Sequence, residues 1–385
     1  MKILYYTWTE IMKDDCVLSL EDMGHTVKVV DYKFSDYFKD ANFVNSFEKE
    51  LFKDNYDCII SIDFIPLISK IALRNKIKYI SWIVDSPNLS LYCLMVFNPY
   101  NYIFHFDSRE ANILKNMGVS NIYYMPIGVN DKRLSTLLGG YTRSYINDIS
   151  FMGNMYNEKF NEFDTIVGMS EYEKGFLEGI IRSQLRIFGE DIMEEAIPQH
   201  IMDSILTRIS LDDNEEVLIT KKQILFNLMR RKATVIERKE IVKMIGDRWG
   251  IDLYTQSDTS DMPNVRNHGF ISYYENMSKM FFNSKINLNI TMRGIQSGSS
   301  LRNQDIMAAG GFLLSNYQSD LADMYNDGED LVMYYTRQDL ADKIEYYLSH
   351  DKEREEIADN GRRKTLENNS YYLAWKKIFS IAGLE

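Results

Sequence analysis

The sequence contains few cysteines. Its 385 residues include only Cys16, Cys58 and Cys93, an odd number that lie far apart and form no C-x-x-C pair. Disulfide frameworks and structural zinc sites depend on paired or clustered cysteines, so we expect neither here. The three thiols are predicted to be buried and reduced.

Long apolar runs are also missing. No stretch of about 18 apolar residues is present, so no helix is expected to span a bilayer. The first residues, MKILYYTWTE, lead directly into a predicted strand and not into the apolar segment of a signal peptide. Together with the reduced thiols, these features predict a cytoplasmic protein.

The sequence also has no excess of positive charge. The formal net charge is −12 at pH 7, whereas proteins that bind nucleic acid or anionic membranes normally need a basic face. Neither is expected as the main partner. The hydrophobic content of 45% and charged content of 26% are typical of a globular chain, and the length suffices for two α/β domains.

Metal-binding motifs are lacking as well. The chain has no H-E-x-x-H, no D-x-D at a strand end and no cluster among its five histidines. These are common patterns for divalent cations. The sequence therefore predicts no metal site.

What the sequence does contain is a repeated alternation of short apolar strands with amphipathic helices, which predicts parallel sheets. One set of predicted strands lies at residues 2–6, 26–32, 58–62, 79–84, 103–106 and 122–125. A second set lies at residues 149–152, 251–254, 286–291, 312–314 and 331–334. The first unit lacks G-x-G-x-x-G, so it implies no dinucleotide.

These patterns predict two Rossmann-like domains, the first at 1–130 and the second at 145–365. Within the second, residues 160–235 are helical in pattern and are interpreted as an insertion, and a separate helix is predicted at 237–249. Two facing sheets of this kind place one ligand-binding cleft between them.

The segment 284–316 carries the strongest functional pattern. A predicted strand is followed by a loop rich in Gly and Ser and by a helix at 301–309. Converging backbone N–H groups and the helix dipole favour a phosphate at such a loop. Arg302 would add a cation, and Asp305 would accept hydrogen bonds from a ribose diol. Alternatively the glycines only form turns, and Asp305 only complements the helix dipole.

Residues 302–348, RNQDIMAAGGFLLSNYQSDLADMYNDGEDLVMYYTRQDLADKIEYYL, resemble the carboxyl-terminal signature of glycosyltransferases related to the spore maturation protein CgeB. This GT-B group lies near the group 1 transferases. Asp305 stands at the place of the acid that leads the signature helix, and Ala309-Gly310-Gly311 at that of the turn after it. Upstream segments such as DCIISIDFIPLISK, YISWIVDSP and DISFMGNMYNEK resemble the same family.

The resemblance implies a GT-B fold in which the last segment, 366–385, returns to pack on the first domain. It also implies transfer of a sugar from a nucleotide diphosphate sugar, with UDP-sugars favoured, to a hydroxyl acceptor in the cleft. Metal independence and retention of configuration are expected. Whether the acceptor is a protein, a glycan or a lipid stays open, as does self-association.

Several further residues are predicted to border the donor. Gly153 and Asn154 follow the strand at 149–152, and the resemblance places their loop beside the donor phosphates. Thr291 ends a strand at the mouth of the cleft, and Gly298 lies in the phosphate loop. Arg293 is predicted to neutralise charge on the departing diphosphate.

On the acceptor side, Asp85 and Asp107 both follow strands. Asp85, on a short turn beside Pro87, is our candidate for the general base; an Asx-turn or a helix cap is the alternative. Members of the family often carry two acids eight positions apart, but Ser297 stands where the first would be. A binding module that has lost turnover therefore stays open as an alternative. A nucleotide-sugar epimerase also stays open, because GT-B folds serve such enzymes too.

Overall fold

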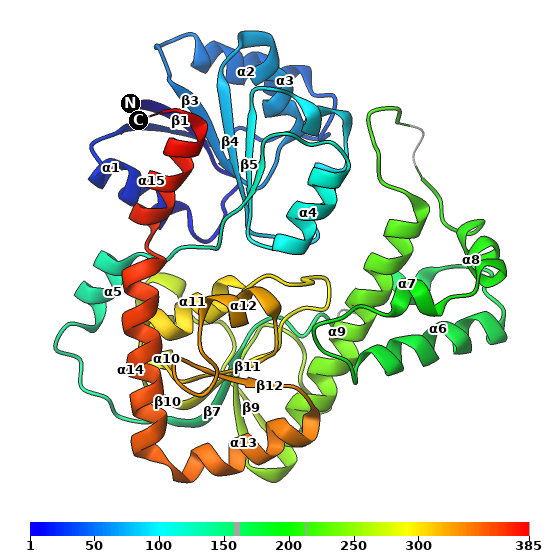
Figure 1. Ribbon diagram of the computed structural model, residues 1–385, viewed down its shortest axis with the longest axis vertical. Coiled ribbons are helices and arrows are strands. Elements are labelled where there is room, and N and C mark those ends of the chain that lie inside the picture. Colours follow the sequence, from blue (N-terminus) through cyan, green and yellow to red (C-terminus); the bar gives the residue numbers. More distant parts are fainter. Residues whose placement is uncertain (158–161, 212–213, 385) are drawn as a thin grey trace.

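Two α/β halves stack one above the other in the computed structural model, and a helical arm projects beside them (Figure 1). The structure describes residues 1–157, 162–211 and 214–384. None of the helices in these ranges is long and apolar enough to cross a membrane.

The upper half in Figure 1 is built on a parallel sheet with the strand order β2-β1-β3-β4-β5-β6. Its strands are β1 (Lys2–Tyr6), β2 (Thr26–Val30), β3 (Cys58–Ile62), β4 (Lys78–Ile83), β5 (Asn101–His105) and β6 (Ile122–Tyr124). Every residue of β3 is buried, because helices cover both faces of the sheet. Strands buried in this way are nearly continuous apolar runs. The strand order reverses between β1 and β3, which opens a crevice at their carboxyl ends.

The helices of this half are α1 (Lys13–Asp22), α2 (Ala41–Leu51), α3 (Pro66–Asn75) and α4 (Ser108–Asn116). The sequence did not predict α2, whose apolar face packs through Phe43 and Phe47. The chain leaves through α5 (Asp131–Leu138), which the sequence did not predict.

The second half repeats the design with the order β12-β11-β10-β7-β8-β9. Its strands are β7 (Asn147–Met152), β8 (Ile251–Tyr254), β9 (Val265–Asn267), β10 (Ser284–Asn289), β11 (Leu313–Asn316) and β12 (Val332–Tyr334). The order reverses between β7 and β10, so the loops after these two strands form the corresponding crevice. The predicted class, two facing Rossmann-like sheets, is confirmed.

The helical arm consists of α6 (Glu171–Gln184), α7 (Met193–Ala196), α8 (Gln199–Leu206) and the start of α9 (Lys221–Arg248). The predicted break before 237 is wrong, because α9 is one helix of 28 residues that Thr220 begins with a capping box. Its first half packs inside the arm through Phe226 and Met229, and its second half packs on the second sheet through Ile241 and Ile245. The arm is thus a rigid extension of a core helix.

The remaining helices of the second half are α10 (Ser278–Phe282), α11 (Leu301–Ala308), α12 (Ser319–Met324), α13 (Arg337–Ser349) and α14 (Asp351–Asn368). The last helix, α15 (Tyr371–Ala382), returns to the first sheet, as predicted (Figure 1). Its Trp375 packs 5.1 Å from the Trp82 ring of β4. The chain passes between the two halves twice, before α5 and before α15. These two passages meet where Tyr371 N donates to Val129 O at 2.9 Å.

Candidate functional site

The Gly- and Ser-rich loop between β10 and α11 lies against the first domain. A Cβ atom added to Gly298 would stand 2.8 Å from the Phe106 ring, and one added to Gly294 would stand 2.9 Å from Pro87 Cδ. Both glycines are therefore needed because two backbones approach closely. Gly298, predicted to border the diphosphate, is buried at this domain contact.

Asp107 supplies the acceptor for the N–H groups of that loop. Its Oδ2 accepts from Gln296 N at 2.8 Å, and its Oδ1 accepts from Ser297 Oγ at 2.7 Å. The same carboxylate caps α4 through Arg109 N at 3.1 Å, and its residue is fully buried. A carboxylate from the first domain thus holds the loop at which we predicted a phosphate.

A second carboxylate completes this contact. Asp320, at the start of α12, accepts from Ser108 N at 2.8 Å and from Ser108 Oγ at 2.6 Å. Ser297 Oγ also lies 3.1 Å from it. Burial raises the pKa of Asp320. We call Asp107, Ser108, Ser297 and Asp320 the interdomain latch.

Asp305 presents a different environment. Tyr273 Oη donates to its Oδ1 at 3.2 Å, but its Oδ2 is buried and has no hydrogen-bond partner among the described residues. Burial raises the pKa of Asp305 to about 7, although the charges of Arg302 and Arg133 oppose this rise. A buried acceptor without a donor is costly, so a ligand that donates to Oδ2 of Asp305 would be stabilised here.

The neighbours of Asp305 join both domains. Arg133 on α5 makes a two-pronged ion pair with Asp15 on α1, with Nη2–Oδ2 and Nε–Oδ1 distances of 2.9 Å. Its guanidinium lies 5.1 Å from the Tyr273 ring. Arg302 Nη1 lies 3.7 Å from Asp305 Oδ2 and is directed toward α10. Arg302 therefore faces Asp305 and α10, and not the loop where a diphosphate was predicted.

Arg293 was predicted to act on the leaving group, but the structure engages it elsewhere. Its Nε and Nη2 pair with the Glu237 carboxylate on α9 at 2.8 and 2.5 Å, and its Nη1 donates to Ile187 O at 2.7 Å. The guanidinium lies 4.4 Å from the Phe188 ring. The charge is neutralised by a buried partner, so Arg293 ties the loop to the arm in this arrangement.

The loop after β7 is joined to the end of β10 by a cation that the sequence reasoning missed. Arg238 Nη2 donates to Ile290 O at 2.7 Å, and its Nη1 donates to Asn154 O. Burial lowers its pKa, and its Nε has no partner among the described residues. Arg238 lies in a helical run of basic and apolar residues, so no sequence signal separates it from solvated neighbours.

The other residues that were predicted to bind the nucleotide sugar line the crevice between β7 and β10 or lie beneath it. A Cβ atom added to Gly153 would stand 3.2 Å from the Phe151 ring and 3.6 Å from Arg238 Nη1. Asn154 Oδ1 accepts from Tyr156 N. Thr291 is only 2% exposed, and its N–H donates to Asn316 Oδ1 at 2.7 Å. Thr291 is thus a buried support of the loop and does not stand at an open mouth.

Two carboxyls mark the crevice of the first sheet. Asp63 follows β3, and its Oδ1 accepts from Val84 N at 3.1 Å and from Asp85 N at 3.3 Å. Burial and the charge of Asp85 raise the pKa of Asp63 to about 7. Asp85 itself is exposed. The candidate base therefore stands at the surface on a turn that a buried acid holds.

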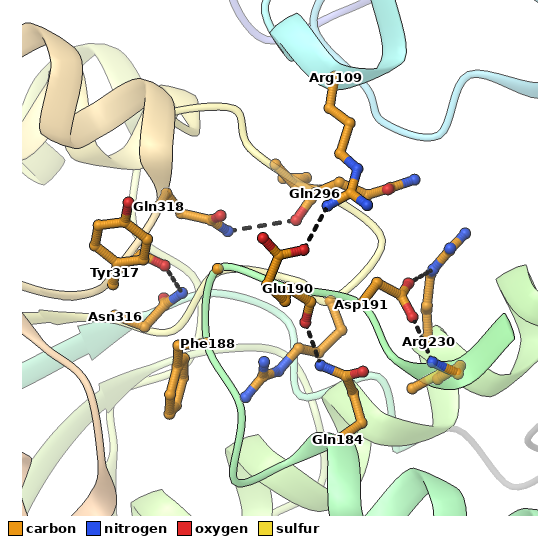
Figure 2. Close-up of a pocket in the computed structure, with 14 residues that line it drawn as sticks. Arg109, Gln184, Phe188, Glu190, Asp191, Arg230, Gln296, Asn316, Tyr317 and Gln318 are labelled. Atoms are coloured by element: carbon orange, nitrogen blue, oxygen red, sulfur yellow. Dashed lines mark hydrogen bonds and ion pairs between the residues drawn. The ribbon is translucent and has the colours of Figure 1, made fainter. Parts of the chain in front are cut away.

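A small cavity of about 30 Å³ opens between α4, the arm and the loops after β10 and β11. Figure 2 shows Arg109 reaching from α4 toward Glu190 and Gln296, with Tyr317 and Gln318 on the opposite wall. Arg230 Nε pairs with Asp191 at 2.6 Å. Of the predicted site residues, Arg293 lies in its lining. In the described ranges, no three His, Cys, Asp or Glu side chains gather in a way that would hold a metal ion.

Comparisons with known proteins bear on both halves. Residues 223–379 match a family model described as glycosyl transferase-like. No curated protein matches the chain. The match confirms a glycosyltransferase-like domain in the second half, and the narrower likeness to CgeB stays a prediction.

Solved structures match over nearly the whole chain. A glycosyltransferase from Rickettsia africae is 12% identical, with 99% of this chain and 97% of that chain covered and a TM-score of 0.53. Anabaena HepE in complex with UDP-glucose is 11% identical, with 100% and 99% covered and a TM-score of 0.52. A sucrose-phosphate synthase from Thermosynechococcus elongatus is also 11% identical, with 100% and 97% covered and a TM-score of 0.53.

The fold is that of the GT-B glycosyltransferases. This confirms the predicted architecture. At such low identity the likeness concerns the fold alone, because one fold hosts many activities. The activity has to be argued from the site.

Proposed function

We propose that this protein is a CgeB-like glycosyltransferase that moves a sugar from a nucleotide diphosphate sugar, with UDP-sugars favoured, to a hydroxyl acceptor between the domains. The observation that carries the proposal is Asp305 in the second turn of α11, a buried carboxyl whose Oδ2 accepts no hydrogen bond from the described residues and has Arg302 Nη1 3.7 Å away. It lies inside the segment that matches the glycosyl transferase-like family. A ribose diol would supply the missing donors.

The crevice between β7 and β10 suits the rest of a donor. Its two loops meet at Arg238, and Arg302 adds a second cation beside Asp305. The Arg238 guanidinium and the loop N–H groups would supply the positive charge that a leaving diphosphate needs. We therefore propose that transfer requires no metal ion.

The first domain would present the acceptor. Asp85 is exposed after β4, where the loops of the first sheet face the second. We propose transfer with retention: the leaving diphosphate takes the acceptor proton, and Asp85 orients the acceptor hydroxyl. Closure of the domains excludes the water that would otherwise hydrolyse the donor.

The latch sets a condition on this mechanism. The Gln296 and Ser297 N–H groups bind Asp107 in the closed arrangement. A diphosphate that uses these donors would have to displace that carboxylate. Donor binding is therefore proposed to open the latch.

The test is a thermal-shift measurement with UDP, GDP, CDP and ADP, each with and without EDTA. A ligand at about 100 times its dissociation constant adds roughly 2.7 kcal/mol of stability. We expect a selective shift from one nucleotide, unchanged by EDTA and lost in Asp305→Ala. Asp323→Ala, an exposed acid on α12, is the matched control. A screen without any shift would contradict the proposal.

A nucleotide-sugar-binding module without turnover is the second candidate. Two observations favour it: Ser297 stands where the family carries an acid, and Asp107 already holds the loop N–H groups. Release of UDP from a donor sugar, lost in Asp305→Ala, would exclude this candidate. Nucleotide binding without release across many acceptors would support it.

A further inference from the structure

A polar groove runs along one face of α4, beside the cavity of Figure 2. Arg109, Asn112, Ile113 and Asn116 are spaced so that they share one side of the helix. Gly189 and Glu190 of the arm and Gln296, Ser297, Tyr317 and Ser319 of the second domain complete the lining. We call this the α4 groove. Its volume is about 470 Å³, and it shares five of its residues with the smaller cavity: Arg109, Gly189, Glu190, Gln296 and Tyr317.

The α4 groove offers hydrogen-bonding groups that the protein does not use. Asn112 and Asn116 are exposed, and within the described part of the chain their amides and that of Gln296 make no hydrogen bond. In the adjoining cavity, Gln318 donates to Ile295 O at 3.3 Å, and its oxygen accepts no hydrogen bond from the described residues. Each amide provides both a donor and an acceptor, which is the pairing that vicinal hydroxyls require.

The charges of this region cancel. Arg109 Nη1 lies 3.7 Å from Glu190 Oε2, and Arg230 is paired with Asp191. Arg293, on the wall between the cavity and the loop, is paired with Glu237. An anionic ligand would find no unopposed cation among these described residues, so the lining favours a neutral ligand.

The shape of the groove also fits sugar rings. Tyr317 stacks on Tyr335 at 5.2 Å between ring centroids, and Gly189 packs against its ring so closely that a Cβ would lie 2.7 Å from it. The fixed ring offers an apolar surface beside polar groups. The face of α4 from Arg109 to Asn116 is about 10 Å long, which leaves room for more than one ring.

We propose that the α4 groove binds a neutral oligosaccharide, and that this glycan is the acceptor. This inference rests on the proposed function. Gln296 and Ser297 of the predicted phosphate loop are themselves part of the groove lining, so a hydroxyl held there would lie beside the donor. Its oxygen would bond to the anomeric carbon while the bond from that carbon to the phosphate oxygen breaks, and its proton would leave with the diphosphate.

The test compares the wild type, the double variant Asn112→Ala/Asn116→Ala and Lys115→Ala. Lys115 is an exposed residue of α4 that does not line the groove. Each protein is first checked for a thermal shift with UDP. Binding is then measured by calorimetry, in the presence of UDP, for neutral tetrasaccharides of glucose, galactose, mannose and N-acetylglucosamine. A uronic-acid tetrasaccharide and free monosaccharides serve as comparators.

We expect at least one neutral tetrasaccharide to bind, with an affinity about tenfold lower in the double variant, as for the loss of about 1.4 kcal/mol. Lys115→Ala should match the wild type. Equal binding by the double variant, binding of only the charged glycan, or binding of no tetrasaccharide would overturn the inference. Loss of the UDP shift in the wild type would instead overturn the proposed function, so the two failures are distinguishable.

Discussion

Two buried carboxylates on the two sides of the same loop have opposite environments. Asp107 accepts six hydrogen bonds, from Ser86, Arg109, Glu110, Gln296 and twice from Ser297. Asp305 accepts one, from Tyr273, and keeps a buried oxygen without a donor among the described residues. Fully bonded groups stabilise a structure, whereas under-bonded ones mark positions where a ligand completes it. Asp107 therefore belongs to the architecture, and Asp305 is the carboxyl at which we propose that a ligand binds.

The largest loss of stability is expected for Arg293, whose guanidinium is paired inside the protein. Arg293→Ala would leave Glu237, which is 1% exposed, without its counter-ion. Removing one partner of a buried ion pair costs about 3–5 kcal/mol, so the urea midpoint should fall strongly. If Arg293 served only the diphosphate, stability would stay unchanged and UDP affinity alone would fall. Arg182→Ala, which removes an exposed partner of Glu240, is the control and should change little.

The next effect concerns the latch itself. Asp107→Ala removes the cap of α4 and leaves buried N–H groups of the loop without an acceptor, which should cost about 3 kcal/mol. Thermal denaturation measures this loss. Because the freed N–H groups become available to phosphate, we expect the shift caused by UDP to persist or to grow. Loss of UDP binding together with normal stability would show that Asp107 belongs to the ligand site after all.

The third effect tests Asp305 through pH. Since its folded pKa is raised to about 7, above the unfolded value of about 3.9, the folded state binds the extra proton and stability falls as pH rises between these values. Asp305→Asn should remove that part of the slope and be more stable than the wild type at pH 8, by about 2 kcal/mol. Urea unfolding at pH 5 and pH 8 measures it. Equal slopes in both proteins would contradict the assignment.

The affinity for a nucleotide should rise with pH, whereas the stability of the free protein falls. A ribose diol donates to the ionised carboxyl, so UDP affinity should rise from pH 6 to pH 8 as Asp305 loses its proton. Asp305→Asn should bind UDP weakly at both values. Calorimetry at the two pH values measures this, with Asp323→Asn as the control. An affinity independent of pH in the wild type would place the nucleotide elsewhere.

The smallest effects come from two glycines. Gly298→Ala would force a Cβ to within 2.8 Å of the Phe106 ring, and such overpacking should cost about 1–3 kcal/mol. Gly175→Ala, in an exposed turn of α6 with open space around it, should instead add about 0.5–1 kcal/mol. The two melting temperatures should therefore move in opposite directions. A neutral Gly298→Ala would mean that the domains do not close on this loop.

Parts of the fold could be predicted because local patterns decide them. Buried parallel strands are continuous apolar runs, so β1, β3 and β8 begin and end where the sequence predicts. The predicted break between two helices before residue 237 is wrong, because the local sequence pattern does not show whether a helix continues or ends there. Only its packing against both the arm and the second sheet makes α9 a single helix.

The candidate site was predictable only in part. The order strand, loop, helix and strand is as predicted, whereas the roles of Arg302 and Asp305 stay predictions. The partners of Arg293, the role of Arg238 and the α4 groove depend on contacts between distant segments. The cytoplasmic location, the absence of a metal requirement, the retention of configuration and the nucleotide stay predictions.

The sequence by itself determined the two parallel sheets, the returning helix and the position of Asp305 in the first turns of α11, since periodicity and turn chemistry act over short distances. The tertiary structure alone decided which carboxylate is bonded and which is open. Asp107 is the N-cap of α4 and Asp305 lies in the second turn of α11, and no local pattern tells which of the two carboxylates is bonded. The approach of the domains brings six hydrogen bonds to the first and encloses the second, because hydrogen bonding and desolvation depend on neighbours that the chain supplies from far away.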